Sequence, residues 1–290
     1  MIKFRGYILI LVFLLTACTQ APVVPKEQEK SEENIVTTPD GKITFEVINN
    51  IQIPQEKVET IKEEILAAYE VIKNSIHTTY VPSDRIQIFL NEGNQNSWGF
   101  AKEILLYDIK DDRYPLVHEM THSILGYGNN FDTSSGYFTQ EGFADYMEQK
   151  YGNTTIHSHQ IMKHFIDSNK LIPISKLIDT NYAHSYFRPK FTNEYEKNAL
   201  MKMSYIHSSS FISYLIDTYG IEKFEQIYND KDLAKKIDEV YGKHIDVLEK
   251  EWIALINNQT DLTTNEKLIM DLYNFVSVID KIDPKYFTKE

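Results

Sequence analysis

The sequence predicts an α+β fold, in which a small α/β N-terminal subdomain with a mixed sheet precedes a mostly helical C-terminal subdomain. Two observations carry this prediction. Short β-branched segments with alternating apolar residues are confined to the part before residue 111. From residue 139 onward, apolar residues recur mostly at the three- and four-residue steps of amphipathic helices. We place the two subdomains at 41–136 and 137–290 and expect a cleft where they meet.

The first subdomain is expected to combine strands with two helices. Strands are predicted at 43–49, 85–92 and 103–110, and an amphipathic helix at 54–77. The stretch NEGNQNSWG after the second strand has the composition of a turn-rich loop. A second helix is expected to begin at Pro115, which suits a first turn, and to end near Gly126 or Gly128.

The second subdomain is expected to be a succession of helices. Their apolar spacing predicts helices at 139–151, 157–168, 197–219, 221–229, 233–241, 244–257 and 263–279. The segment LIPISKLID at 171–179 is expected to be a connection between two of them.

The first 40 residues are expected to lie outside the folded body. Residues 1–17 carry Lys3 and Arg5 before an apolar run that is too short to span a bilayer, as in a signal peptide. The run ends in LTAC, which resembles the lipobox of bacterial lipoproteins. That resemblance implies that Cys18 is lipidated and holds the protein on a cell membrane, outside the cytoplasm. Residues 18–40 are polar without apolar periodicity, which predicts a flexible tether.

Charge and cysteine content exclude two classes of protein. The formal net charge of −12 would be repelled by a phosphate backbone, which excludes nucleic acid as a partner. Cys18 is the only cysteine, so the chain cannot form an internal disulfide and is no disulfide scaffold.

A metal-binding pattern, HEMTH, occupies residues 118–122 of the helix that begins at Pro115. Residues four apart share one face of a helix, so His118 and His122 can present two ring nitrogens to one Zn²⁺ ion. Glu119 lies beside that face, where its carboxylate can take a proton from a water molecule polarised by the metal. Taken alone, the five letters also fit a solvated helix face that carries two histidines.

A third metal ligand is needed for a catalytic zinc site, and Glu141 is the candidate. It follows His122 after 18 intervening residues, near the start of the next predicted helix. Asp145 lies one turn further on the same helix face. Its carboxylate can accept the outer N–H of a ligand histidine and so fix the orientation of the ring.

The spacing of these residues, together with the string EGFADY at 141–146, resembles the thermolysin-like gluzincins and their peptidase-MA-like domains. The resemblance continues in YIHSSSFISYLIDTYG at 205–220 and covers roughly residues 85–250. It implies a zinc metallopeptidase with His118, His122 and Glu141 as ligands, Glu119 as the general base and Asp145 as the partner of a ligand histidine.

The same resemblance makes Tyr205 a candidate donor to the oxyanion of the reaction, with His207 as the alternative. The exopeptidase string G-x-M-E-N of related aminopeptidases is missing, so recognition of a substrate α-amine is not implied. We also expect the outer edge of the strand at 103–110 to be unpaired, and to bind an extended substrate by strand addition.

Together these features predict a membrane-anchored, zinc-dependent hydrolase that acts on a peptide or protein substrate. Two alternatives stay open. One is a catalytically inactive lipoprotein of the same fold that binds a ligand or partner. The other is a lipoprotein in which zinc has only a structural role.

Overall fold

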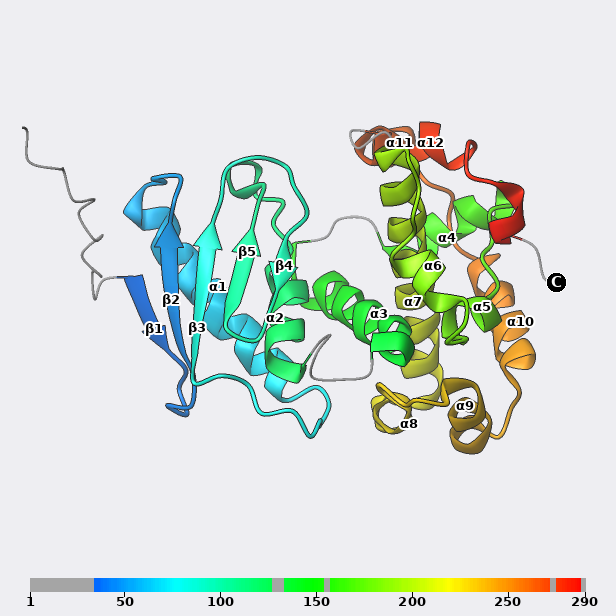
Figure 1. Ribbon diagram of the computed structural model, residues 1–290, viewed down its shortest axis with the longest axis horizontal. Helices are drawn as coiled ribbons and strands as arrows, with labels where there is room; N and C mark the ends of the chain where they lie inside the picture. Colours follow the sequence, from blue (N-terminus) through cyan, green and yellow to red (C-terminus); the bar gives the residue numbers. More distant parts are fainter. Residues whose placement is uncertain (1–33, 127–132, 154–156, 272–274, 288–290) are drawn as a thin grey trace, which may run out of the picture. The chain divides into compact units, whose positions relative to one another are not determined.

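The structure is a computed structural model that describes residues 34–126, 133–153, 157–271 and 275–287 (Figure 1). Its α+β class confirms the sequence prediction, because a five-stranded mixed sheet is built before residue 107 and helices dominate the rest. The buried apolar side chains form one continuous cluster that runs from the sheet into the helices. The predicted signal peptide, and Cys18 with it, lies outside the described residues.

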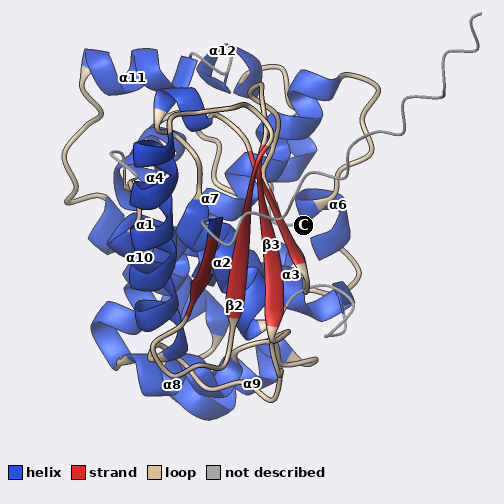
Figure 2. Ribbon diagram, turned by 90° about the vertical axis from the view of Figure 1, so that its left-hand side faces the viewer, coloured by secondary structure: helices blue, strands red, loops and turns tan. Residues whose placement is uncertain are grey.

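The sheet has the strand order β1-β2-β3-β5-β4. The strands are β1 (Ile35–Thr37), β2 (Thr44–Asn49), β3 (Arg85–Leu90), β4 (Trp98–Gly99) and β5 (Glu103–Leu106). The three central strands, β2, β3 and β5, are parallel, and β1 and β4 join them antiparallel at the two edges. The register places Val47 beside Ile88, and Ile88 beside Ile104, so the sheet has a row of buried apolar side chains. The strands twist as neighbouring strands do in proteins (Figure 2).

Two helices accompany the sheet. Helix α1 (Gln55–Lys73) buries residues at three- and four-residue steps, from Val58 to Ile72. Helix α2 (Leu116–Leu125) packs against α1 and also contacts β4 and β5. All ten residues of α2 are buried, so the polar side chains of HEMTH lie inside the protein and not on a solvated helix face.

The helices that follow α2 are centred on α7, the longest helix described, which contacts most of the others. They are α3 (Thr133–Tyr151), α4 (Ser158–Asp167), α5 (Ile174–Ile178), α6 (Ala183–Phe187), α7 (Glu194–Tyr219), α8 (Ile221–Ile227), α9 (Leu233–Tyr241), α10 (Ile245–Ile256), α11 (Thr264–Asp271) and α12 (Phe275–Ile279). Short 3₁₀ segments, η2 (Ile109–Asp111) and η4 (Pro284–Phe287), complete the described elements. Helix α3 packs against α2 and against α7, and so links the sheet to the helices that follow.

The close contact between α3 and α7 depends on Gly142. A Cβ atom at this position would lie 2.7 Å from the Cβ of Ser208 and 2.6 Å from Cδ1 of Ile212. Any larger residue would therefore push the two helices apart. Since Glu141 precedes Gly142, this contact also fixes where the Glu141 side chain begins.

Several predicted boundaries were wrong. Residues 35–37, which we expected within the tether, form the edge strand β1. The expected loop after β3 contains the edge strand β4, and the expected connection at 171–179 contains helix α5. Helix α3 begins at Thr133, before the predicted start, and α6 was not predicted. The helix expected at 263–279 corresponds to α11 and α12, with 272–274 outside the described residues.

Within the part of the chain that the structure describes, no helix combines the length and the apolar character needed to cross a membrane.

Candidate metal centre

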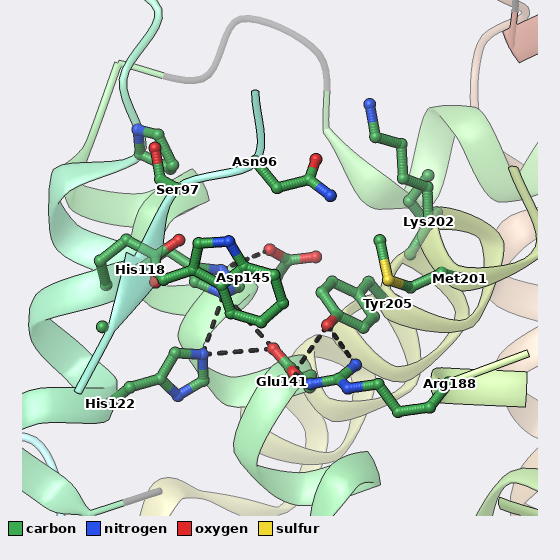
Figure 3. Close-up of a pocket in the computed structure, with 15 residues that line it drawn as sticks. Asn96, Ser97, His118, His122, Glu141, Asp145, Arg188, Met201, Lys202 and Tyr205 are labelled. Carbon is green, nitrogen blue, oxygen red and sulfur yellow. Dashed lines mark hydrogen bonds and ion pairs between the residues drawn. The ribbon is translucent and has the colours of Figure 1, made fainter. Parts of the chain in front are cut away.

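The two histidines of HEMTH meet at the base of a cleft (Figure 3). One helical turn separates His118 from His122, and their Nε2 atoms lie 3.0 Å apart. Both residues are buried, with 7% and 5% of their surface exposed. Together with Glu119 they form a buried group whose donor atoms all lie within 4.8 Å of one another, which could hold a metal ion.

Glu141, on α3, brings a carboxylate to the same point. Its Oε2 atom lies 3.2 Å from Nε2 of His122 and 3.4 Å from Nε2 of His118. Ligand atoms that are about 2.0–2.1 Å from a tetrahedral Zn²⁺ ion lie about 3.3 Å from one another. The three donor atoms have separations close to this value and are of the type that zinc prefers. The residues present therefore fit a zinc ion with two nitrogen ligands and one oxygen ligand.

A second set of contacts from α3 orients His118. Its Nδ1 atom lies 2.7 Å from Oδ1 of Asp145, and a carboxylate can only accept, so Nδ1 carries the proton. The lone pair of Nε2 is then directed to the metal position. The backbone N–H of His118 donates to Oε2 of Glu148 at 3.1 Å. Glu148 was not singled out from the sequence, although it lies seven residues after Glu141, on the same face of α3.

The ionisation of the three donors reflects their burial and mutual contact. Burial opposes charge on His118, but its hydrogen bonds with Asp145 and Glu141 raise its pKa well above the ordinary value. Burial lowers the pKa of His122, against the attraction of Glu141. Burial of Glu141 would favour its neutral form, yet His122, His118 and Arg188 hold its pKa well below the ordinary value. In the metal-free protein, a proton therefore occupies the histidine pair beside an ionised Glu141.

The pKa of Glu119 is shifted in the opposite direction to that of Glu141. Burial, opposed by the attraction of His118 and aided by the nearby carboxylates of Glu141, Asp145 and Glu148, raises the pKa of Glu119 to about 8. Its side chain lines the cleft next to the three donor atoms. A carboxyl group with this pKa can both accept and release a proton near neutral pH.

The second oxygen of Glu141 is held by two residues from outside α3. Arg188, which directly follows α6, donates from Nη2 to Oε1 of Glu141 at 2.8 Å. The hydroxyl of Tyr205, on α7, donates to the same oxygen at 2.7 Å. Sequence reasoning missed Arg188. The only available signal was weak, namely that arginine is rare in this chain and occurs only four times.

The two candidate donors to the oxyanion, Tyr205 and His207, lie in different surroundings. The ring of Tyr205 lies in the cleft, stacked on His118 with ring centroids 6.3 Å apart. His207 is fully buried, with Nδ1 donating to the backbone carbonyl of Met203 and Nε2 accepting from the backbone N–H of Ile172. Burial lowers the pKa of His207 to about 4. His207 is therefore a structural residue that fastens the 171–179 segment to α7.

The cleft has a volume of about 440 Å³. One wall is the segment 96–99 and the other is formed by residues 201–206 of α7, with the donor residues and Glu119 at the base. The wall residues beyond the centre are Asn96, Ser97, Trp98, Gly99, Pro115, Met201, Lys202 and Ile206. Met201 and Lys202 extend along the α7 wall (Figure 3).

The prediction that the strand at 103–110 has a free outer edge was wrong. Strand β5 is paired on both sides, with β3 and with β4. The edge strand beside the cleft is β4, which was hidden in the sequence because it has only two residues and contains a glycine. That glycine is required, since a Cβ atom on Gly99 would lie 2.1 Å from the carbonyl oxygen of Glu119. Strand β4 thus runs directly against the helix that carries both histidines.

No protein-family model matches the sequence, and no curated protein is similar to it.

Proposed function

We propose that the protein is a zinc-dependent peptidase of the gluzincin type, held at the outer face of a membrane by a lipid on Cys18. One observation carries the proposal. Two imidazole nitrogens and one carboxylate oxygen come together at separations of 3.0–3.4 Å, at the base of an open cleft and beside a further carboxyl group. A purely structural zinc site has no need of an open side or of a neighbouring proton acceptor.

His118, His122 and Glu141 would be the metal ligands, and Asp145 would hold the ring of His118 in place. Bound Zn²⁺ would polarise the scissile carbonyl and make water more acidic. Glu119 would take the proton from the attacking water and pass it to the leaving amine, so that one carboxyl group serves as base and then as acid. A nearby cation favours the carboxylate form of Glu119, which is the form that accepts the proton.

The backbone of the substrate would lie along the outer edge of β4. The N–H of Phe100 donates to the carbonyl of Glu103, so Phe100 belongs to a hydrogen-bonded pair of the β4–β5 ladder. Such pairs alternate in an antiparallel ladder, so the N–H and C=O of Gly99 point away from β5. These groups can pair with an extended peptide, and Gly99 is also the residue that lies against Glu119. This geometry would present a peptide bond to the proposed base.

The anchor part of the proposal is supported by the sequence. Two basic residues, a short apolar run and LTAC at 15–18 are the features of a lipoprotein signal peptide. An acidic body with a net charge of −12 would not bind an anionic membrane surface by charge alone. Covalent lipid on Cys18 would supply the attachment instead.

The test uses the full-length protein in detergent. Its zinc content is measured, it is incubated with an unfolded protein, and the products are identified by mass spectrometry. We expect cleavage that requires zinc, and no cleavage by Glu119→Gln although this variant still binds zinc. The matched control is Glu63→Gln, the same chemical change at an exposed position of α1, which should cleave like the wild type.

The outcomes separate the proposal from its alternatives. Zinc binding that stabilises the fold, without cleavage of any polypeptide by the wild type, would support a structural zinc site. A wild type that binds no zinc and cleaves nothing would support a binding module. Cleavage by Glu119→Gln at the wild-type rate would disprove the assignment of the base.

A further inference from the structure

The carboxylate of Glu141 is divided between two sets of partners. Its Oε2 atom faces the two histidine nitrogens, at 3.2 and 3.4 Å. Its Oε1 atom accepts hydrogen bonds from Nη2 of Arg188 at 2.8 Å and from the hydroxyl of Tyr205 at 2.7 Å. Nη1 of Arg188 also donates to the hydroxyl oxygen of Tyr205 at 2.7 Å, which closes a three-membered network around Oε1 (Figure 3).

The three side chains of this network come from three separate parts of the fold. Glu141 lies on α3 and is only 2% exposed, Tyr205 lies on α7, and Arg188 follows the end of α6. Nη1 of Arg188 also donates to the carbonyl oxygen of Phe187 at 2.6 Å. The guanidinium group lies over the ring of Tyr137, with its carbon 4.9 Å from the ring centroid. Few rotations therefore remain to any of the three side chains.

We propose that Arg188 and Tyr205 are positioning residues that make Glu141 a metal ligand through one oxygen only. A carboxylate can give a metal either one oxygen or both. Two short hydrogen bonds to Oε1, one of them from a positive group, hold that oxygen away from the metal position. The position that a second oxygen would fill stays open, as a catalytic metal site requires.

The network also sets the charge of the site. Arg188 offsets the negative charge of Glu141, so a bound cation loses less of its positive charge to the carboxylate. The hydroxyl proton of Tyr205 is directed at Glu141, so in this arrangement Tyr205 acts through the ligand. This role differs from the donation to a substrate oxyanion that the family resemblance implied for Tyr205.

The inference rests on the metal-binding part of the proposed function and does not depend on peptide cleavage. It predicts changes in metal binding in the absence of any substrate. Hydrogen-bond partners of metal ligands commonly change metal affinity by about 10–100-fold when they are removed. We expect Arg188→Met to weaken zinc binding by about that factor, and Tyr205→Phe by about 10-fold.

The experiment measures zinc affinity by competition with a chelator and records the visible spectrum of the Co²⁺-substituted protein. Tetrahedral Co²⁺ absorbs more strongly than Co²⁺ with five or six ligands. If Glu141 gains a second metal bond when Oε1 is released, Arg188→Met should lose absorption intensity. Arg188→Lys keeps the charge but cannot contact Glu141 and Tyr205 in the same way, so it should recover only part of the affinity.

A matched control comes from another arginine. Arg85 contacts Oε2 of the buried Glu46 at 2.7 Å within the sheet, away from the cleft. Arg85→Met should lower the melting temperature but leave zinc affinity and the Co²⁺ spectrum unchanged. The melting temperature of each variant in the presence of a chelator shows whether it is folded. If Arg188→Met does not fold, Tyr205→Phe, which removes one hydroxyl, decides the question.

Wild-type affinity and a wild-type Co²⁺ spectrum in folded Arg188→Met or Tyr205→Phe would overturn the inference, even if turnover fell. Those results would mean that the two side chains act on the substrate. A wild-type protein that bound no zinc would instead overturn the proposed function itself. A wild type that binds zinc without cleaving peptides would leave the positioning role intact.

Discussion

Replacement of Glu119 by glutamine should stabilise the metal-free protein at alkaline pH while it abolishes peptide hydrolysis. Glu119 is 5% exposed, and burial is the main reason why its pKa rises from 4.5 to about 8. Glutamine has nearly the same size and cannot ionise. The variant therefore removes the cost of a buried charge without opening a cavity.

The magnitude follows from the difference between the folded and the unfolded state. In the unfolded chain the carboxyl group loses its proton near pH 4.5, whereas in the folded protein it keeps the proton up to about pH 8. The contribution of Glu119 to stability thus falls as the pH rises from 4.5 to about 8, and is constant above that range. Since one pKa unit corresponds to about 1.36 kcal/mol, the full loss is at most about 5 kcal/mol. Glu119→Gln should recover most of this loss at pH 8.5 and little of it at pH 5.

The assay is urea unfolding of the wild type and the variant in a chelating buffer at pH 5 and pH 8.5. The quantity of interest is the change with pH of the difference in unfolding free energy between the two proteins, because groups that do not interact with Glu119 titrate equally in both. Glu63→Gln, at an exposed position of α1, is the control and should show no such change. Loaded with zinc, Glu119→Gln should lose at least about 10²-fold in turnover, which is the usual contribution of a positioned base.

The same difference in unfolding free energy at pH 5 and pH 8.5 would refute the claim that Glu119 is held protonated by burial. Retained hydrolysis, in contrast, would refute its role as base. The two parts of the prediction can therefore fail separately.

Four further predictions concern the metal and the anchor. Glu141→Gln should weaken zinc binding and shrink the rise in melting temperature that zinc produces, because a neutral oxygen is a poorer ligand; calorimetric titration and thermal unfolding measure both. Asp145→Asn should weaken zinc binding by about 10–100-fold in a chelator competition, because the ring of the ligand histidine loses its carboxylate partner. Zinc should release protons near pH 7 and bind more tightly as the pH rises, because the pKa of His118 is raised in the metal-free protein; titrations in buffers of different ionisation heat would give equal heats if no proton were released. Cys18→Ser should move the protein out of the membrane fraction or leave it as a precursor, and normal retention and maturation would contradict the anchor.

The spacing of residues along helices could be predicted because it depends only on local geometry. Positions four apart put His118 and His122 on one face of α2, and Glu141 and Asp145 on one face of α3. Once α2 and α3 pack together, these faces meet, and Glu141 and Asp145 contact the histidine rings. The α+β class was predictable for the same reason, because the spacing of apolar residues along the chain differs between strands and helices.

Other features depend on tertiary packing that the sequence does not display. Arg188 contacts Glu141, which is 47 positions away in the sequence, and only the fold brings the end of α6 to the metal centre. Strand β4 is two residues long and its Gly99 is indistinguishable from a turn glycine until α2 is placed beside it. Strand β1 is three residues long and pairs with β2 at the edge of the sheet, and the polar residues around it concealed it in the sequence.

A lipid anchor on Cys18 would limit the working range of the protein, because only a short length of chain precedes the sheet. Strand β1 is one edge of the sheet and β4, with the cleft beside it, is the other. Ile35, the first residue of β1, follows Cys18 by 17 positions, and a chain of that length can extend no further than about 60 Å. With a lipid on Cys18, the start of β1 would stay within that distance of the bilayer, and the cleft would lie within one sheet width of it. Its targets would then be polypeptides that emerge from, or settle on, the same cell surface, whereas proteins diffusing in the surrounding medium would be met only when they came within reach.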